Sequence, residues 1–301
     1  MAVTDRATTR VTPRSATIVE PAPVLAVPKP DTWFKRNESK VIGTISVTTF
    51  LVLWQSLGFI RAAWPQGIVL GGLKLAVPPT LFLPVPSEVI LAFRDLVQGG
   101  ELAQDVAVSL QEFAIGYVLA VVVGVLLGLG IGWYRRFSYA VDPFITFFYA
   151  TPRIVLLPLL IIWFGIGIWS KIAVVFLGAF FAIVINTAAG VRNLDANLIK
   201  VARSFGATDL QLFRTIALPG SVPFVLTGLR LGIGHALVGV VVGELVAAQH
   251  GIGRLMAIAG STFQSDKVFA GLIIIASAGM LTTLLLQRLE RRYEAWRPRA
   301  N

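Results

Sequence analysis

Several ionisable side chains lie inside stretches of this sequence that are otherwise strongly apolar. Four of them are candidates for chemistry: Arg153, Arg230, His235 and Glu244. A charge within an apolar span is costly, so it usually faces a cavity or a partner. A guanidinium can bind a sulfonate, nitrate or carboxylate group through its planar fork of donors. The two arginines could therefore line a path for an anion, or they could form structural ion pairs, for example with Glu244 or Asp142.

The same residues give little support to enzymatic chemistry. His235 and Glu244 are about two and a half helical turns apart, so they face different directions and cannot form a catalytic dyad. The chain has no cysteine and only two histidines, which excludes thiol catalysis and metal sites rich in either residue. It also has no G-x-x-x-x-G-K-[ST] phosphate-binding loop. We expect no catalytic, cofactor-binding or metal-binding residues: His235 is an interior group or a gate, and Glu244 is a gate or an interfacial charge.

The composition is that of an integral membrane protein. Of 301 residues, 55% are hydrophobic and 14% are charged, whereas soluble domains have about 25% charged residues. Six apolar runs are long enough to cross a bilayer. They lie at about residues 41–60, 109–133, 141–164, 171–190, 222–247 and 268–286. Glycine pairs such as Gly124 and Gly128 have the spacing that lets helices approach closely. We predict an all-α membrane protein with six transmembrane helices.

The distribution of Lys and Arg predicts the topology. With the N-terminus inside, the inside segments carry 18 of the 26 basic residues and the outside segments carry six. Because positive charge concentrates on the cytoplasmic side, both termini are predicted to be cytoplasmic, and the net charge of +10 does not call for nucleic acid. The predicted regions are a disordered basic cytoplasmic tail (1–40), the first transmembrane helix (41–60), an extracytoplasmic segment with short helices (61–108), a transmembrane core (109–287) and a basic cytoplasmic tail (288–301).

The longest polar interruption in the second half of the chain spans residues 200–219. Apolar residues recur there at helical spacing in two short runs, which predicts two amphipathic helices. Gly206 fits the left-handed turn that ends the first helix, and Thr208 and Gln211 have the spacing of a capping box. Pro219 is predicted to end the second helix. Such a two-helix knob could enter a groove of another protein, or it could lie on lipid headgroups.

This interruption resembles the cytoplasmic signature of bacterial ABC importer permeases. That signature reads Glu-Ala-Ala, three residues, Gly, nine residues, Ile, one residue and Leu-Pro. The matching residues are Ala202, Gly206, Ile216, Leu218 and Pro219. Lys200 stands where the family usually has Glu, and Val201 replaces the first Ala. Because Lys200 reverses the charge, a docking groove must either compensate for it or not use that position.

The resemblance extends over roughly residues 80–295. The similar segments are LPVPSEV (83–89), TPRIVLLPLLIIWFGIGIWSKI (151–172), GLR (228–230), GEL (243–245), GIGRLM (251–256) and LERRYEAWRP (289–298). They are similar to the subfamily that imports nitrate, taurine, alkanesulfonates and related small solutes. The resemblance implies the type I ABC importer permease fold in a bacterial inner membrane. It also implies a second permease copy, usually identical, two cytoplasmic ATPase subunits and an extracytoplasmic solute-binding protein.

The resemblance also assigns roles to the segments singled out above. Residues 193–219 become the coupling segment that sits in a groove of the ATPase. The coupling residues are Lys200, Ala202, Phe205, Gly206, Ile216, Leu218 and Pro219, and the candidate pathway residues are Arg153, Arg230, His235 and Glu244. The GIGRLM segment is either an outer re-entrant loop that meets the binding protein or an ordinary surface turn. The expected function is ATP-driven import of a small, anionic solute by alternating access; the alternative is a stand-alone secondary transporter or channel.

Overall fold

The computed structural model describes residues 33–64, 68–70, 73–75, 79 and 81–293. The first 32 residues of the predicted N-terminal tail lie outside the described residues, and residues 33–40 belong to the first helix. Residues 294–301 of the predicted C-terminal tail also lie outside them. The chain divides into two units, residues 1–50 and 51–301, and the second unit holds every candidate site residue.

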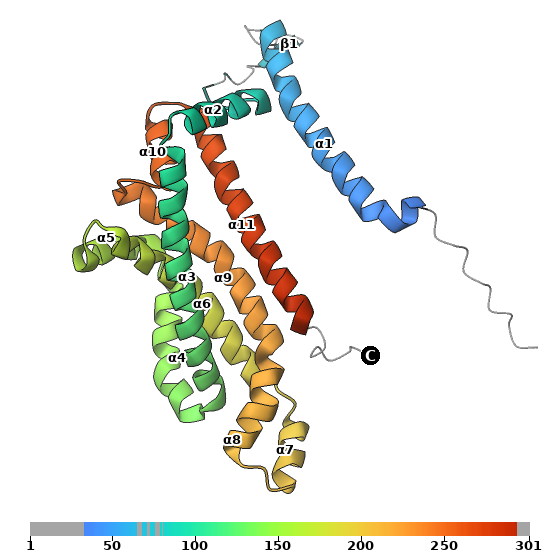
Figure 1. Cartoon of the computed structure of the whole chain (residues 1–301), viewed down its shortest axis with the longest axis vertical. Coiled ribbons are helices and arrows are strands. Elements are labelled where there is room, and N and C mark those ends of the chain that lie inside the picture. Colours follow the sequence, from blue (N-terminus) through green and yellow to red (C-terminus); the bar gives the residue numbers. More distant parts are fainter. Residues whose placement is uncertain (1–32, 65–67, 71–72, 76–78, 80, 294–301) are drawn as a thin grey trace, which may run out of the picture. The chain divides into compact units, whose positions relative to one another are not determined.

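Helices make up nearly all of the described chain (Figure 1). They are α1 (Trp33–Ala63), α2 (Pro86–Gln98), α3 (Leu102–Trp133), α4 (Arg135–Ala150), α5 (Arg153–Phe164), α6 (Ile168–Arg192), α7 (Ala196–Ser204), α8 (Asp209–Leu212), α9 (Leu218–Ala247), α10 (Ile252–Ser261) and α11 (Ser265–Tyr293). A π-helical turn, Phe213–Ala217, joins α8 to α9. Two short antiparallel strands, β1 (Ile68–Leu70) and β2 (Leu73–Leu75), follow α1.

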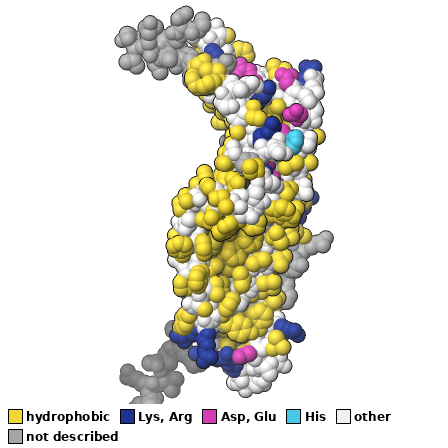
Figure 2. Space-filling model, turned by 90° about the vertical axis from the view of Figure 1, so that its left-hand side faces the viewer, with side chains coloured by type: hydrophobic (Ala, Val, Ile, Leu, Met, Phe, Trp, Pro, Cys, Tyr) yellow, Lys and Arg dark blue, Asp and Glu magenta, His cyan; other side chains and the backbone are white. Residues whose placement is uncertain are grey.

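The described helices confirm the predicted class of an all-α membrane protein. Five of them are long and apolar enough to cross a bilayer, and α4 with α5 makes a sixth span if the two are counted as one broken helix. Figure 2 shows a broad hydrophobic band on one face, with charged side chains gathered toward its two ends. This distribution suits a protein whose middle lies in hydrocarbon and whose ends meet water.

The third predicted span is broken at one of its three prolines, Pro152, and continues through Pro143 and Pro158. The axes of α4 and α5 differ by 103°. Thr151, which precedes Pro152, has an extended backbone with ψ of 125°, because a proline disfavours the helical conformation in the residue before it. Pro158 lies inside α5 without ending it. The break therefore places Arg153 at the first position of a new helix.

The core of the second unit is built from α3, α6 and α9, with α6 in the middle. Glycines on α3 and α6 allow these helices to pack closely. A Cβ atom added to Gly128 would lie 2.6 Å from the Cβ of Thr187 on α6. A Cβ added to Gly178 would lie 2.7 Å from the carbonyl oxygen of His235 on α9. The backbones of the three central spans are therefore held together by positions that accept no larger side chain.

The hinge in the polar segment is confirmed in detail. Gly206 has φ of +80°, and the N–H groups of Gly206 and Ala207 donate to the carbonyls of Arg203 and Ala202. This is the Schellman pattern that ends a helix. The capping box is also present: the N–H of Thr208 donates to Gln211 Oε1, and the N–H of Gln211 donates to Thr208 Oγ1. Local sequence signals therefore determined this turn.

The prediction that Pro219 ends the second short helix is wrong. The helical path is continuous over Asp209–Val246, a stretch of 38 residues. Pro219 lies in the first turn of α9, directly after the π-helical turn Phe213–Ala217. The hydrogen-bonding pattern changes at this point, so the missing N–H and the ring of Pro219 are accommodated there. As a result, α8 and α9 belong to one continuous helix.

Replacing Gly128 with Ala should destabilise the protein by about 1–3 kcal/mol, because the new methyl group forces α3 away from α6. Gly234→Ala is the matched control, since no described atom lies within 4 Å of its added Cβ. Thermal unfolding in detergent measures the difference. The packing account requires a lower midpoint for Gly128→Ala alone, and equal midpoints for the two variants would contradict it.

Candidate functional site

A cavity of about 450 Å³ lies at the break between α4 and α5. Tyr149, Thr151 and Arg153 line it from the broken span, and His235 and Gly239 line it from α9. The cavity therefore lies where the helical path is interrupted, beside the continuous helix that carries His235. Irregular backbone within a membrane protein is tolerated where it lines such a cavity.

Arg153 and His235 meet in this cavity, although they are 82 residues apart in sequence. Arg153 Nη1 lies 3.2 Å from His235 Nδ1. Because a guanidinium is always a donor, Nδ1 of His235 accepts this hydrogen bond and its proton resides on Nε2. Both side chains are half-buried. The pair presents a fixed positive charge and a ring N–H donor, which suits an anion.

Helix α5 packs against α6, and this packing sets the position of Arg153. Leu157 and Leu160 are buried and pack with Val174 of α6. The outward side chains of α5 and the turn after it are largely exposed and apolar: Ile154, Val155, Ile162, Trp163, Phe164 and Ile166. A shift of α6 or of either end of α5 would therefore move Arg153 in the cavity.

Arg230 does not line this cavity. It forms an ion pair with Glu290 of α11, and its side chain is about half exposed. The partners suggested from the sequence are engaged elsewhere, since Asp142 pairs with Arg192 and Glu244 lies in a buried cluster. Of the four candidate pathway residues, the structure brings together Arg153 and His235 and places Arg230 and Glu244 apart from them.

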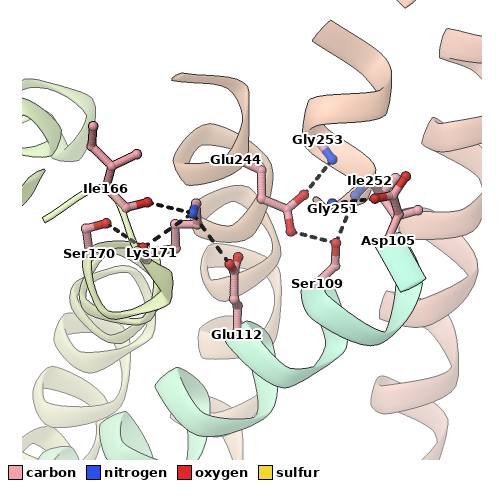
Figure 3. Close-up of polar contacts among 11 residues, drawn as sticks. Asp105, Ser109, Glu112, Ile166, Ser170, Lys171, Glu244, Gly251, Ile252 and Gly253 are labelled. Atoms are coloured by element: carbon pink, nitrogen blue, oxygen red, sulfur yellow. Dashed lines mark hydrogen bonds and ion pairs between the residues drawn. The ribbon is translucent and has the colours of Figure 1, made fainter. Parts of the chain in front are cut away.

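Glu244 is buried, with 1% of its surface exposed, so it is not an interfacial charge. It belongs to a group that we call the anchor cluster: Asp105, Ser109, Glu112, Lys171 and Glu244 (Figure 3). These residues come from α3, α6 and α9. Apart from Glu244, the cluster was missed in the sequence. A signal was available, because Asp105, Ser109 and Glu112 are spaced to share one face of a helix.

The anchor cluster holds the start of α10. The N–H of Gly251 donates to Asp105 Oδ1 at 2.8 Å, and the N–H of Ile252 donates to Ser109 Oγ at 2.9 Å. The N–H of Gly253 donates to Glu244 Oε2 at 2.6 Å. The first amides of a helix have no partner within the helix, and here acceptors from two other helices satisfy them. GIGRLM is therefore the buried beginning of a short helix rather than an ordinary surface turn.

The predicted coupling segment combines an anchored side with an exposed side. Leu212 and Ala217 are fully buried, and Phe213 packs edge-on against Trp133 at the end of α3. In contrast, 87% of Phe205 is exposed. Arg203 and Asp209 form an ion pair at 3.3 Å that links α7 to α8 across the hinge.

The remaining predicted coupling residues are distributed over both sides of this segment. Lys200 and Leu218 are exposed, and Ala202, Ile216 and Pro219 are half-buried. Further apolar residues are also exposed on the two short helices: Leu198, Val201 and Leu210. The segment therefore carries an apolar surface that no residue described by the structure covers.

Comparison with known proteins identifies relatives of this chain. The sequence model of the family described as "Binding-protein-dependent transport system inner membrane component" matches residues 120–295. The chain is 33% identical over 269 residues to an aliphatic sulfonates transport permease protein, SsuC, of Bacillus subtilis, covering 86% of this chain and 98% of the relative. It is also 33% identical over 266 residues to the taurine transport system permease protein TauC of Escherichia coli, covering 87% and 90%.

A solved structure shares the fold. A chain of the MetNI methionine ABC transporter, solved in an inward-facing conformation, superposes on this chain with a TM-score of 0.55. The match covers 64% of this chain and 95% of that chain at 21% identity. At this identity the similarity concerns the arrangement of the helices alone.

Replacing Gly251 with Ala should release the start of α10. Gly251 has φ of +128°, and an added Cβ would lie 2.4 Å from Cδ of Glu244, so we expect a loss of about 1–3 kcal/mol of local stability. Hydrogen exchange of the amides in residues 251–255 measures it. Gly260→Ala in the same helix is the control, because no described atom lies within 4 Å of its Cβ. Unchanged exchange in Gly251→Ala would refute the anchoring role.

Proposed function

The chain belongs to the family of binding-protein-dependent transport system inner membrane components, and we propose that it imports a small anion in a complex driven by a separate ATPase. It is an ABC importer permease of the sulfonate and taurine type, and its relatives are named as transport subunits rather than enzymes. It is a multi-pass membrane protein. The solute, the coupling to ATP and the assembly are the proposed part.

The cavity that contains Arg153 and His235 carries the proposal for the solute. Sulfonates and taurine share a sulfonate group, whose oxygens match the donors of a guanidinium. Helix α5 also begins at Arg153. The partial positive charge of a helix N-terminus favours an anion. A transport site must also release its solute. A half-buried site with a single positive charge, that of Arg153, would bind an anion weakly enough for release. The extracytoplasmic binding protein would then supply most of the selectivity.

The continuous helix from α8 to α9 supports the proposal for coupling. We place the exposed apolar surface around Phe205 in a groove of the ATPase, on the cytoplasmic side, since such a surface marks a contact site. A force on α8 would reach His235 through Asp209–Val246 without crossing a loop. Arg153 stands on a different helix, so movement of α9 would change the Arg153–His235 cavity. Alternating access would then be driven by movement of α9 relative to α5.

The other partners follow from the same assembly. The extracytoplasmic binding protein would contact a second cavity of about 340 Å³, which α10 lines together with the α2–α3 turn and the start of α11. Charged residues of both signs line it: Asp95, Glu101, Arg254 and Lys267. A second, identical permease copy would complete the membrane part. Both termini would be cytoplasmic, as the charge bias predicts.

The competing function is a stand-alone secondary transporter or channel for a small anion. Mild solubilisation of the tagged chain should co-purify an ATPase subunit if the proposal holds. The decisive comparison is uptake of taurine or an alkanesulfonate into proteoliposomes with and without that ATPase and ATP. Uptake that persists without the ATPase would establish the competing function.

Arg153→Met should reduce import of the anionic solute by about tenfold or more, since one charge-assisted contact with the anion is worth about 1.4 kcal/mol or more. Arg230→Met is the control because Arg230 lies outside the cavity. Import per assembled complex measures the effect, and assembly is checked by co-purification. Equal import by both variants would remove Arg153 from the solute path.

Gly206→Val should uncouple ATP hydrolysis from import. A β-branched residue at φ of +80° is strained by roughly 1–2 kcal/mol, which alters the angle between α7 and α8. Gly43→Val is the control, because Gly43 lies in α1, which carries no candidate site residue, and no described atom outside its own helix lies within 4 Å of its added Cβ. The ratio of solute imported to ATP hydrolysed should fall for Gly206→Val alone. An unchanged ratio would show that the hinge angle is not used.

A further inference from the structure

The proposed transport cycle leaves the anchor cluster without a role, although the cluster is the largest buried charged group in the described chain. Asp105, Glu112, Lys171 and Glu244 are each at most 5% exposed. Buried charges in a membrane span are expensive and mark functional sites by default. Holding the start of α10 requires Asp105, Ser109 and Glu244 only. Glu112 and Lys171 need a separate explanation.

Lys171 connects the cluster to the end of α5. Its Nζ donates to the carbonyls of Ile166 and Gly167, each at 3.3 Å, in the turn between α5 and α6. The same turn contains Gly165 with φ of +78°, and Ser170 Oγ donates to the carbonyl of Gly167 at 2.9 Å. The position of this turn is therefore set by Lys171 and its neighbour on α6. Arg153 is at the opposite end of the same short helix.

Glu112 lies between the two halves of the cluster. Its Oε1 is 4.0 Å from Lys171 Nζ, and its side chain also interacts electrostatically with Glu244. Neither of its oxygens accepts a hydrogen bond from any residue that the structure describes. The neighbours that act on this carboxyl group are Lys171 on one side and Glu244 on the other. Glu112 therefore contacts both the residue that holds the end of α5 and a residue that holds the start of α10.

The contacts form one unbroken path. Amides of α10 donate to Ser109 and Glu244, and Lys171 contacts both Glu112 and the end of α5 (Figure 3). The carboxyl groups of Glu112 and Glu244 also interact electrostatically. Within the described chain, hydrogen bonds or close charges connect each step.

We propose that the anchor cluster is a positioning relay, which passes a displacement of α10 through Glu112 and Lys171 to α5 and so to Arg153. The relay rests on the proposed function, in which the binding protein contacts α10 and Arg153 contacts the solute. Arrival of a loaded binding protein would then adjust the cavity from the α10 side, while the ATPase acts on it through α8. Glu112 and Lys171 are positioning residues in this scheme and do not touch the solute.

The first test compares ATPase stimulation with basal activity in the complete complex, using the ATPase and binding protein that co-purify and taurine as the probe. Glu112→Gln should assemble normally and keep basal ATP hydrolysis, but lose about tenfold of the stimulation by the loaded binding protein. Asp142→Asn is the matched control, because Asp142 pairs with Arg192 at the other end of α6. Full stimulation in Glu112→Gln would overturn the relay.

The second test needs no partner, so it separates failure of the relay from failure of the proposed function. Ser109→Ala removes the acceptor of Ile252 and a donor to Glu244. In the full chain in detergent, hydrogen exchange should rise several-fold at residues 251–253 and also in the turn at 165–168. Ser138→Ala removes a comparable serine from the Asp142–Arg192 pair and should change neither region. A rise confined to 251–253 would overturn the relay.

Discussion

The continuity of one helix is the constraint on which the other features depend. From Asp209 to Val246 the backbone stays helical, with a π-helical turn where a proline would otherwise break it. This helix carries the buried side of the coupling segment at one end, His235 in its middle and Glu244 near its other end. A helix can transmit displacement along its axis because its hydrogen bonds are all internal. Three sites that are distant from one another are thereby placed on one continuous helix.

The span formed by α4 and α5 is broken, in contrast to the continuous helix. Thr151 and Pro152 interrupt the helical path, so α5 turns by 103° relative to α4 and Arg153 lies on a different helix from His235. In contrast, α3, α6 and α9 pack closely at glycine positions and form the framework around this break. The Arg153–His235 contact is the place where the rigid helix and the broken helix meet. In the proposed cycle, a change in this contact would open or close this side of the cavity.

Local signals in the sequence were sufficient for the spans, for the turn at Gly206 and for the capping box at Thr208, because each depends on neighbours a few residues away. The effect of Pro219 was misjudged, since a π-helical turn leaves no clear signature in a single sequence. The contact of Arg153 with His235 and that of Glu112 with Lys171 join different helices, so neither spacing nor composition could reveal them. Arg230 and Arg153 look alike in the sequence, and only the tertiary structure separates an ion pair with Glu290 from a cavity residue.

In the proposed cycle, the helix through α8 and α9 moves as one body and changes the cavity against α5. Since the chain contains no cysteine, spin labels can be attached at chosen cysteines in the assembled complex. One pair, Arg214→Cys with Val238→Cys, reports the length of the continuous helix, and the other, Ile154→Cys with Val238→Cys, reports the width of the cavity. On ATP binding we expect the first distance to stay constant and the second to change. A constant cavity distance, or a first distance that changes because the helix bends at the π-helical turn, would contradict the account.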